Sequence, residues 1–239
     1  MKRRTNNLIA KWKGTFSKGE VKTAEAENPM KQAESQSNGP VLTLIKKEPV
    51  TFQIFRLEDP KNFELMNFVA RVCKRTADKP YKTVIHVEQT RTGSRLVASD
   101  NLRLHVAEIS KRIKGGDYKP HVTKDVITLG EPIEGIKFPI WTKAIPEKLV
   151  ERGVINLEKS GLGKDRKENE KLSVAFNTFT QQTGETVNIC HLGDLTKRKW
   201  AIYRQEGRRE IVLRQKPGRS GESDKKSPIA VIMPIAEAA

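Results

Sequence analysis

The pattern of apolar and polar positions predicts short strands and few helices between residues 41 and 235. The clearest helix signal follows Asp59-Pro60, since aspartate can cap a first turn and proline fits the first helical position. This helix is expected to run to Arg75, with an inner stripe of Leu65, Met66, Val69, Val72 and Cys73. A shorter helix is expected from Pro146 to Arg152, before Gly153.

Apolar runs separated by turn residues predict the strands. They are expected at 50–57, 83–89, 95–99, 102–109, 126–129, 154–157, 172–176, 187–192, 200–203, 210–214 and 229–235. Asp100-Asn101 and Glu206-Gly207 supply the residues of tight turns, so hairpins are expected there. Hairpins combined with few helices predict an α+β fold.

Composition divides the chain. Residues 1–40 are basic and polar, and we expect a disordered tail because so little apolar surface is available for burial. Residues 41–235 are expected to form the folded region, as one domain or as two sub-units, 41–130 and 131–235. Residues 216–228 are rich in Gly, Ser and Lys, which predicts a flexible loop within that region.

The charge balance indicates the partners. Lysine and arginine total 45 against 29 acidic residues, a formal net charge of +16. Nucleic acid is the commonest polyanion to meet such a chain, with an anionic membrane surface or plain solubility as alternatives. No apolar run approaches the ~18 residues of a membrane span. The only cysteines, Cys73 and Cys190, are far apart, which favours buried thiols in a reduced, cytoplasmic protein.

No pattern in the sequence indicates an enzyme. The four histidines lack metal-ligand spacing, and the common nucleotide-binding and hydrolase motifs are absent. Gly161-Leu162-Gly163-Lys164 is only superficially similar to a phosphate loop, because it lacks the following Ser or Thr and the correct glycine spacing. We therefore expect no catalytic residue, no metal and no cofactor.

Three strings carry a family resemblance. They are Arg-Leu-Val-Ala-Ser-Asp-Asn-Leu-Arg-Leu at 95–104, Phe-Pro-Ile-Trp-Thr-Lys-Ala-Ile-Pro at 138–146 and Ala-Val-Ile-Met-Pro-Ile at 230–235. In this order they resemble segments of the bacterial sliding clamp, the β subunit of DNA polymerase III. Ser99, Asn101 and Leu102 stand where that family has Thr, Gly and usually His. Lys143 replaces an arginine and Ala144 a valine.

The resemblance implies a DNA-clamp-like α+β fold, with antiparallel sheets and one or two helices per domain. It also implies a groove that receives short linear peptides from DNA polymerases, clamp-loader proteins and repair proteins. The groove residues carried over are Ser99, Asn101, Leu102, Arg103, Leu104, Pro139, Lys143, Ala144, Val231, Ile232, Met233, Pro234 and Ile235. Leu104, Val231 and Met233 would contribute to its floor, while Arg103 and Lys143 would form a cationic rim.

Clamps hold duplex DNA through phosphate contacts without sequence readout, so the resemblance implies basic DNA-facing residues. Those expected are Arg71, Lys74, Arg75, Lys148, Arg152, Lys197, Arg198 and Lys199. Trp200 and Tyr203 among the last of these would also suit single strands. The partners implied are DNA, polymerase or loader proteins and further copies of this chain.

The chain is short for the three domains of a clamp subunit, so we expect a condensed pair of domains or a single one. The expected function is a clamp-like processivity or accessory factor. Two alternatives stay open: a basic nucleic-acid-binding accessory protein unrelated to clamps, and a pure protein-interaction subunit.

Overall fold

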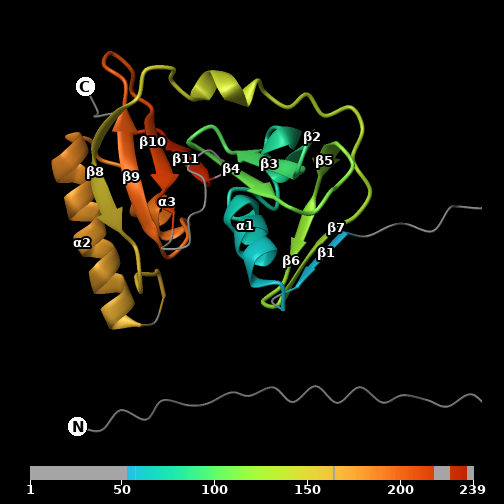
Figure 1. Ribbon diagram of the computed structural model, residues 1–239, viewed down its shortest axis with the longest axis horizontal. Helices are drawn as coiled ribbons and strands as arrows, with labels where there is room; N and C mark the ends of the chain where they lie inside the picture. The colour runs from blue at the N-terminus through green and yellow to red at the C-terminus, as the bar shows by residue number, and fades with distance from the viewer. Residues whose placement is uncertain (1–52, 57, 164, 218–226, 236–239) are drawn as a thin grey trace, which may run out of the picture. The chain divides into compact units, whose positions relative to one another are not determined.

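The computed structural model describes residues 53–56, 58–163, 165–217 and 227–235 (Figure 1). The tail expected at 1–40 and most of the loop expected at 216–228 lie outside these residues. The helices are α1 (Pro60–Ala70), α2 (Arg166–Thr183) and α3 (Ile189–Gly193), with single 3₁₀ turns η1 (Pro80–Thr83) and η2 (Trp141–Ala144). No described helix combines the length and the apolar character that crossing a bilayer requires.

The strands confirm an α+β fold with antiparallel sheets. They are β1 (Gln53–Arg56), β2 (Ile85–Thr90), β3 (Gly93–Ser99), β4 (Arg103–Ile109), β5 (Gly116–Tyr118), β6 (Pro120–Val122), β7 (Val126–Leu129), β8 (Val150–Asn156), β9 (Lys199–Arg204), β10 (Ile211–Gln215) and β11 (Ile229–Ile232). Within the described residues, eight strands form one sheet in the order β5-β2-β3-β4-β11-β10-β9-β8. A small sheet has the order β1-β7-β6.

The junction between β4 and β11 joins the two halves of the large sheet. Leu104 lies opposite Val231, and Val106 lies opposite Ile229. The last described strand of the chain therefore lies in the middle of the sheet. As a result, the segments around 104 and 231, which are far apart in sequence, are direct neighbours.

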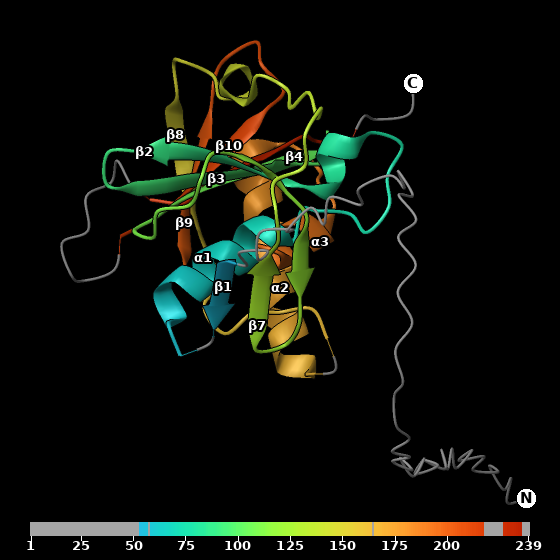
Figure 2. The same ribbon diagram turned by 90° about the vertical axis from the view of Figure 1, so that its right-hand side faces the viewer.

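The two faces of the large sheet are covered differently (Figure 2). Helices α1 and α2 lie on one face, where the main core includes Met66, Phe179 and Trp200, all fully buried. The opposite face is crossed by residues 133–149, here called the connector, which link β7 to β8. Strand alternation sends successive side chains to opposite faces, so each central strand contributes to both layers.

Helix α1 begins as expected but ends early. Asp59 accepts a hydrogen bond from the Asn62 amide at 3.5 Å, and Pro60 is the first helical residue. The amides of Val72 and Cys73 donate to carbonyls only three residues back, which tightens the chain and ends the helix at Ala70. Lys74 and Arg75 therefore lie beyond the helix rather than on it.

Three expected elements were wrong. Residues 146–152 form no helix, because pairing with β9 makes Val150–Asn156 a strand instead. The strand expected at 172–176 lies inside α2, whose buried residues Leu172, Ala175 and Phe179 follow helical spacing. Residues 187–192 contain α3 rather than a strand, and Asn188 caps it. Within α3, Cys190 is exposed, contrary to the expectation of a buried thiol.

His105 links the sheet to α1. It is completely buried and stacks on Phe68 with ring centroids 4.2 Å apart, and its Nδ1 donates to the Phe68 carbonyl at 2.7 Å. Its Nε2 is also buried and has no partner among the described residues. Burial lowers the pKa of His105 from its ordinary 6.5 to about 3, although the Phe68 hydrogen bond opposes the shift.

We predict that His105 makes the fold sensitive to acid. Between pH 6.5 and about pH 3, His105 is protonated in the unfolded chain but neutral in the folded one. The free energy of unfolding therefore decreases as the pH falls through this window. This single group contributes a slope of up to about 1.4 kcal/mol per pH unit. Urea denaturation of wild type and His105→Phe across this range measures it. The variant should show a shallower slope, and His121→Gln, a change at an exposed histidine, should not.

Candidate docking surface and nucleic-acid face

A second apolar cluster lies on the sheet face opposite the helices. Its buried members come from β3, β4, β10 and β11, and they are Val97, Leu104, Val106, Val212 and Val231. The connector packs against them through Phe138, Trp141, Ala144, Ile145 and Leu149. The structure thus brings the strings at 95–104, 138–146 and 230–235 together on one face.

The connector is held across the sheet by a few side-chain contacts. Phe138 stacks on His86 with centroids 4.8 Å apart. The indole Nε1 of Trp141 donates to Glu88 at 2.8 Å, and the Arg95 guanidinium lies 5.6 Å from the Trp141 ring centroid. At the far end the Lys148 amide donates to Gln205 Oε1 at 3.1 Å. The connector therefore runs from β2 to the β9–β10 hairpin.

The turn between β3 and β4 is built by Asp100 and Asn101. The buried Asp100 carboxylate accepts from the backbone amides of Leu102 and Arg103, both at 3.1 Å. Asn101 has a φ of 76°, a left-handed conformation that asparagine tolerates better than most residues. The Met233 amide donates to the Leu102 carbonyl at 2.8 Å, which holds the end of β11 against this turn.

The expected floor of the groove is covered. Leu104 is only 4% exposed and Val231 only 2%, because the connector lies over them. The expected groove residues nearer the surface are Ser99, Asn101, Leu102, Pro139, Lys143, Ala144, Met233 and Ile235, whereas Pro234 is buried. Leu102 and Ile235 are each 53% exposed, so apolar surface remains beside the covered floor.

Two of the expected groove residues point the other way. Ile232 is fully buried in the helix-side core. Arg103 also lies on the helix side, so it forms no part of a rim on the connector face. The reason is strand alternation: Leu104 and Val231 face the connector, and the residues adjacent to them in sequence must face the helices.

Arg103 instead holds an internal ion network. Its guanidinium pairs with Asp194, which caps α3, and lies 3.4 Å from Asp100 Oδ2. Nη2 also donates to the Arg71 carbonyl at the end of α1, at 3.2 Å. Arg71 in turn donates to the Gly193 carbonyl at 3.3 Å. The β3–β4 turn, α1 and α3 are therefore tied together through one arginine.

The basic residues expected to meet DNA fall into separate groups. Arg71, Lys74 and Arg75 are exposed after α1, and Lys197, Arg198 and Lys199 are exposed where β9 begins. Two of the latter are paired with acids, because Lys197 lies 2.9 Å from Glu168 and Arg198 lies 3.4 Å from Glu64. Lys148 and Arg152 lie elsewhere, at the end of the connector and on β8.

Helix α2 carries exposed cations that were not among the residues expected to meet DNA, because a strand and not a helix was expected at 172–176. Arg166, Lys167 and Lys171 are exposed on its first turns. The available signals were Asp165, whose side chain accepts from the amides of Lys167 and Glu168, and Gly184, which ends the helix with a φ of 68°. No group of three or more potential metal-ligating side chains occurs among the described residues.

Comparison with known proteins rests on structure alone, since no family model and no curated protein sequence matches the chain. The β chain of DNA polymerase III from Streptococcus pneumoniae superposes with a TM-score of 0.50 and 12% identity, over 84% of this chain and 69% of that one. The fold is similar to that of bacterial sliding clamps. The β subunit of Thermotoga maritima superposes with a TM-score of 0.50 and 12% sequence identity, over 83% of this chain and 70% of that one. The griselimycin-bound clamp of Pseudomonas aeruginosa superposes with a TM-score of 0.50 and 10% sequence identity, over 81% of this chain and 68% of that one.

We predict that the Arg103 network is a main support of this clamp fold. Arg103→Met leaves the buried Asp100 carboxylate without its cation and should cost about 3 kcal/mol of unfolding free energy. Arg95→Met is the matched control, because Arg95 also pairs with two carboxylates but is one-third exposed, and its loss should cost about 1 kcal/mol or less. Urea denaturation measures both, and equal losses would contradict the prediction.

Proposed function

We propose that this protein is a clamp-like accessory factor of DNA replication or repair. It binds DNA without sequence specificity and docks partner proteins through apolar side chains beside the β3–β4 turn. The observation that carries the proposal is the clamp fold together with the meeting of three clamp-like strings on one sheet face. The structural similarity supports the architecture.

Exposed cations on the helix side support the DNA role. Lys167 and Lys171 lie on α2, whereas Arg71 and Lys74 lie just beyond the end of α1. Such cations bind phosphates and release counterions, an interaction that needs no base contact. The net charge of +16 acts in the same direction by attracting DNA over longer range.

Apolar side chains around the turn support the docking role. Leu102 and Ile235 are half-exposed, and Met233 is partly exposed and bonded to Leu102 through the backbone. We propose that short linear peptides with Leu or Phe anchors, from DNA polymerases or clamp-loader-type proteins, bind here. Because Leu104 and Val231 are covered, such a peptide would engage this rim rather than the floor.

The extent of the structural match supports more than one clamp-like domain in this chain. It spans 68–70% of the clamp chains that it matches at a TM-score of 0.50. We propose that segments 41–130 and 131–235 each correspond to one clamp domain, joined where β11 pairs with β4.

Binding to DNA of random sequence tests the first role. We expect the logarithm of the affinity to fall linearly with the logarithm of the salt concentration, measured by fluorescence anisotropy. Replacing both Lys167 and Lys171 by glutamine should reduce that slope by about 1.8, because each phosphate contact contributes about 0.9. Lys137→Gln combined with Arg209→Gln, two exposed cations outside the helices, is the charge-matched control.

Retention on a closed circle but not on linearised DNA would support a ring. Equal retention on both would favour a simple basic accessory protein. Absence of any salt-dependent DNA binding would contradict the first role and favour a pure protein-interaction subunit.

Peptide binding tests the docking role. A fluorescein-labelled ten-residue peptide with two leucines and a terminal phenylalanine should bind wild type. Leu102→Asp and Met233→Asp should each weaken it at least about tenfold, roughly 1.4 kcal/mol, since a charge would replace an anchor contact. Val174→Asp is the control, because Val174 is 65% exposed on α2. Equal weakening by all three variants would contradict a defined docking surface.

A further inference from the structure

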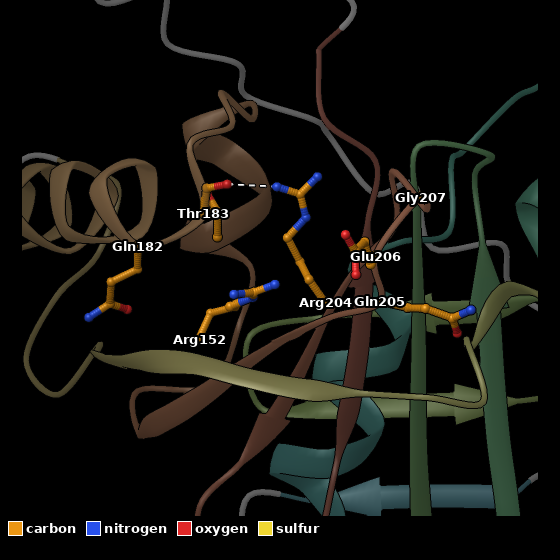
Figure 3. A pocket seen from close by; sticks show the side chains of 7 residues that line it. All are labelled: Arg152, Gln182, Thr183, Arg204, Gln205, Glu206 and Gly207. Atoms are coloured by element: carbon orange, nitrogen blue, oxygen red, sulfur yellow. Dashed lines mark hydrogen bonds between the residues drawn. The ribbon is translucent and has the colours of Figure 1, made fainter.

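A cavity of about 370 Å³ opens at the end of α2, between that helix, β8 and the β9–β10 hairpin (Figure 3). No large apolar side chain lines it, and the lining consists of Arg152, Gln182, Thr183, Arg204, Gln205, Glu206 and Gly207. None of the proposed docking residues lines it. Of the residues expected to meet DNA, Arg152 is the only one in this lining.

The backbone is shaped to bring Arg152 into this cavity. The pairing of β8 with β9 shifts register between Glu151 and Gly153, so Arg152 is the extra residue of a β-bulge. Bulges re-aim side chains and are common beside binding sites. Gly153 follows, and a Cβ there would overlap the side chain of Gln182. The end of the Gln182 side chain therefore packs against the backbone of β8 at Gly153.

The two arginines of the cavity are not equivalent. Arg204 donates from Nη1 to the Thr183 carbonyl at 2.7 Å and from Nη2 to Glu185 at 2.8 Å, so it caps α2 and is neutralised. Its guanidinium has five N–H groups, of which these two bonds use two. Arg152 is exposed and forms no ion pair with any described residue.

The lining therefore holds a cation without a counter-charge beside a second guanidinium. An unpaired guanidinium attracts an anion, and the N–H groups that Arg204 does not use for Thr183 and Glu185 can donate to the same anion. Glu206 is the one acid in the lining, is exposed and pairs with neither arginine. Gln182 adds an amide whose Oε1 is buried and has no donor among the described residues, so this oxygen suits a guanidinium N–H rather than an anion. The donors available to an anion are the N–H groups of the two arginines that bond to no described residue.

We propose that this cavity binds a phosphate group, with Arg152 as the main ligand and Arg204 as the second. Guanidinium N–H pairs match the spacing of phosphate oxygens, and Arg is the preferred residue for such recognition. A volume of about 370 Å³ falls in the range of small-molecule sites, so the phosphate would be carried by a nucleotide or by a DNA strand. Only the DNA source depends on the function proposed above.

Titration with inorganic phosphate tests the site directly. Protein labelled with ¹⁵N-arginine is titrated at constant ionic strength, with chloride as the exchanging ion, and the arginine Nε–H signals are followed by NMR. We expect a saturable shift for the resonance that is absent from Arg152→Gln. That variant should bind phosphate at least about tenfold more weakly, because the unpaired guanidinium is lost.

Two further variants make the test specific. Glu206→Gln should tighten phosphate binding several-fold, since it removes the only negative charge of the lining. Arg209→Gln removes an exposed cation from the same hairpin outside the cavity and should leave the affinity unchanged. A shift that never saturates, or equal losses in Arg152→Gln and Arg209→Gln, would overturn the proposal in favour of general charge screening.

A second arm separates the two sources. If Arg152→Gln also lowers the salt slope of DNA binding by about 0.9 and phosphate competes with duplex DNA, the group belongs to a DNA backbone. If Arg152→Gln leaves DNA binding unchanged while phosphate still saturates the wild-type site, the ligand is a free phosphate ester. Either of these two outcomes supports a phosphate site in the cavity. Failure of the phosphate titration with DNA binding intact would overturn only the site. The reverse result would overturn only the proposed function.

Discussion

Antiparallel pairing between β4 and β11 is the constraint on which the rest of the molecule depends. It closes the central gap of the large sheet and places Val231 beside Leu104 and Ile232 beside Arg103. On one face this pairing supplies the floor under the connector. On the other face the same pairing forms the surface against which α1 packs, and from which Arg103 reaches its partners. Both proposed interaction faces therefore share one backbone ladder.

Parts of both sheets could be predicted from local pattern. The hairpin around Asp100-Asn101 and the strand at 126–129 depend on turn chemistry and alternation, which are readable in a single sequence. The resemblance of the three strings also predicted that they meet in one place. The apolar cluster contains a residue from each string, namely Leu104, Ala144 and Val231. The direction of Arg103 could have been predicted as well, because alternation with Leu104 already placed it on the other face.

Other features depend on contacts that no local pattern encodes. Residues 172–176 have apolar positions that suit a short strand, and only the caps at Asp165 and Gly184 show that they belong to a long helix. The β-bulge at Arg152 arises from pairing with β9, about fifty residues later. The neutralisation of Lys197 by Glu168 likewise depends on how α2 packs. Exposure and charge pairing are tertiary properties, so the expected DNA face could be only partly specified.

The central position of β11 also has a consequence for how the fold is assembled. Strands β4 and β10 each keep one open edge until residues 229–232 insert between them. The contact between β4 and β11 spans more than a hundred residues, so its closure is a late, long-range event. During synthesis both edges stay unpaired until then and are open to association with other chains.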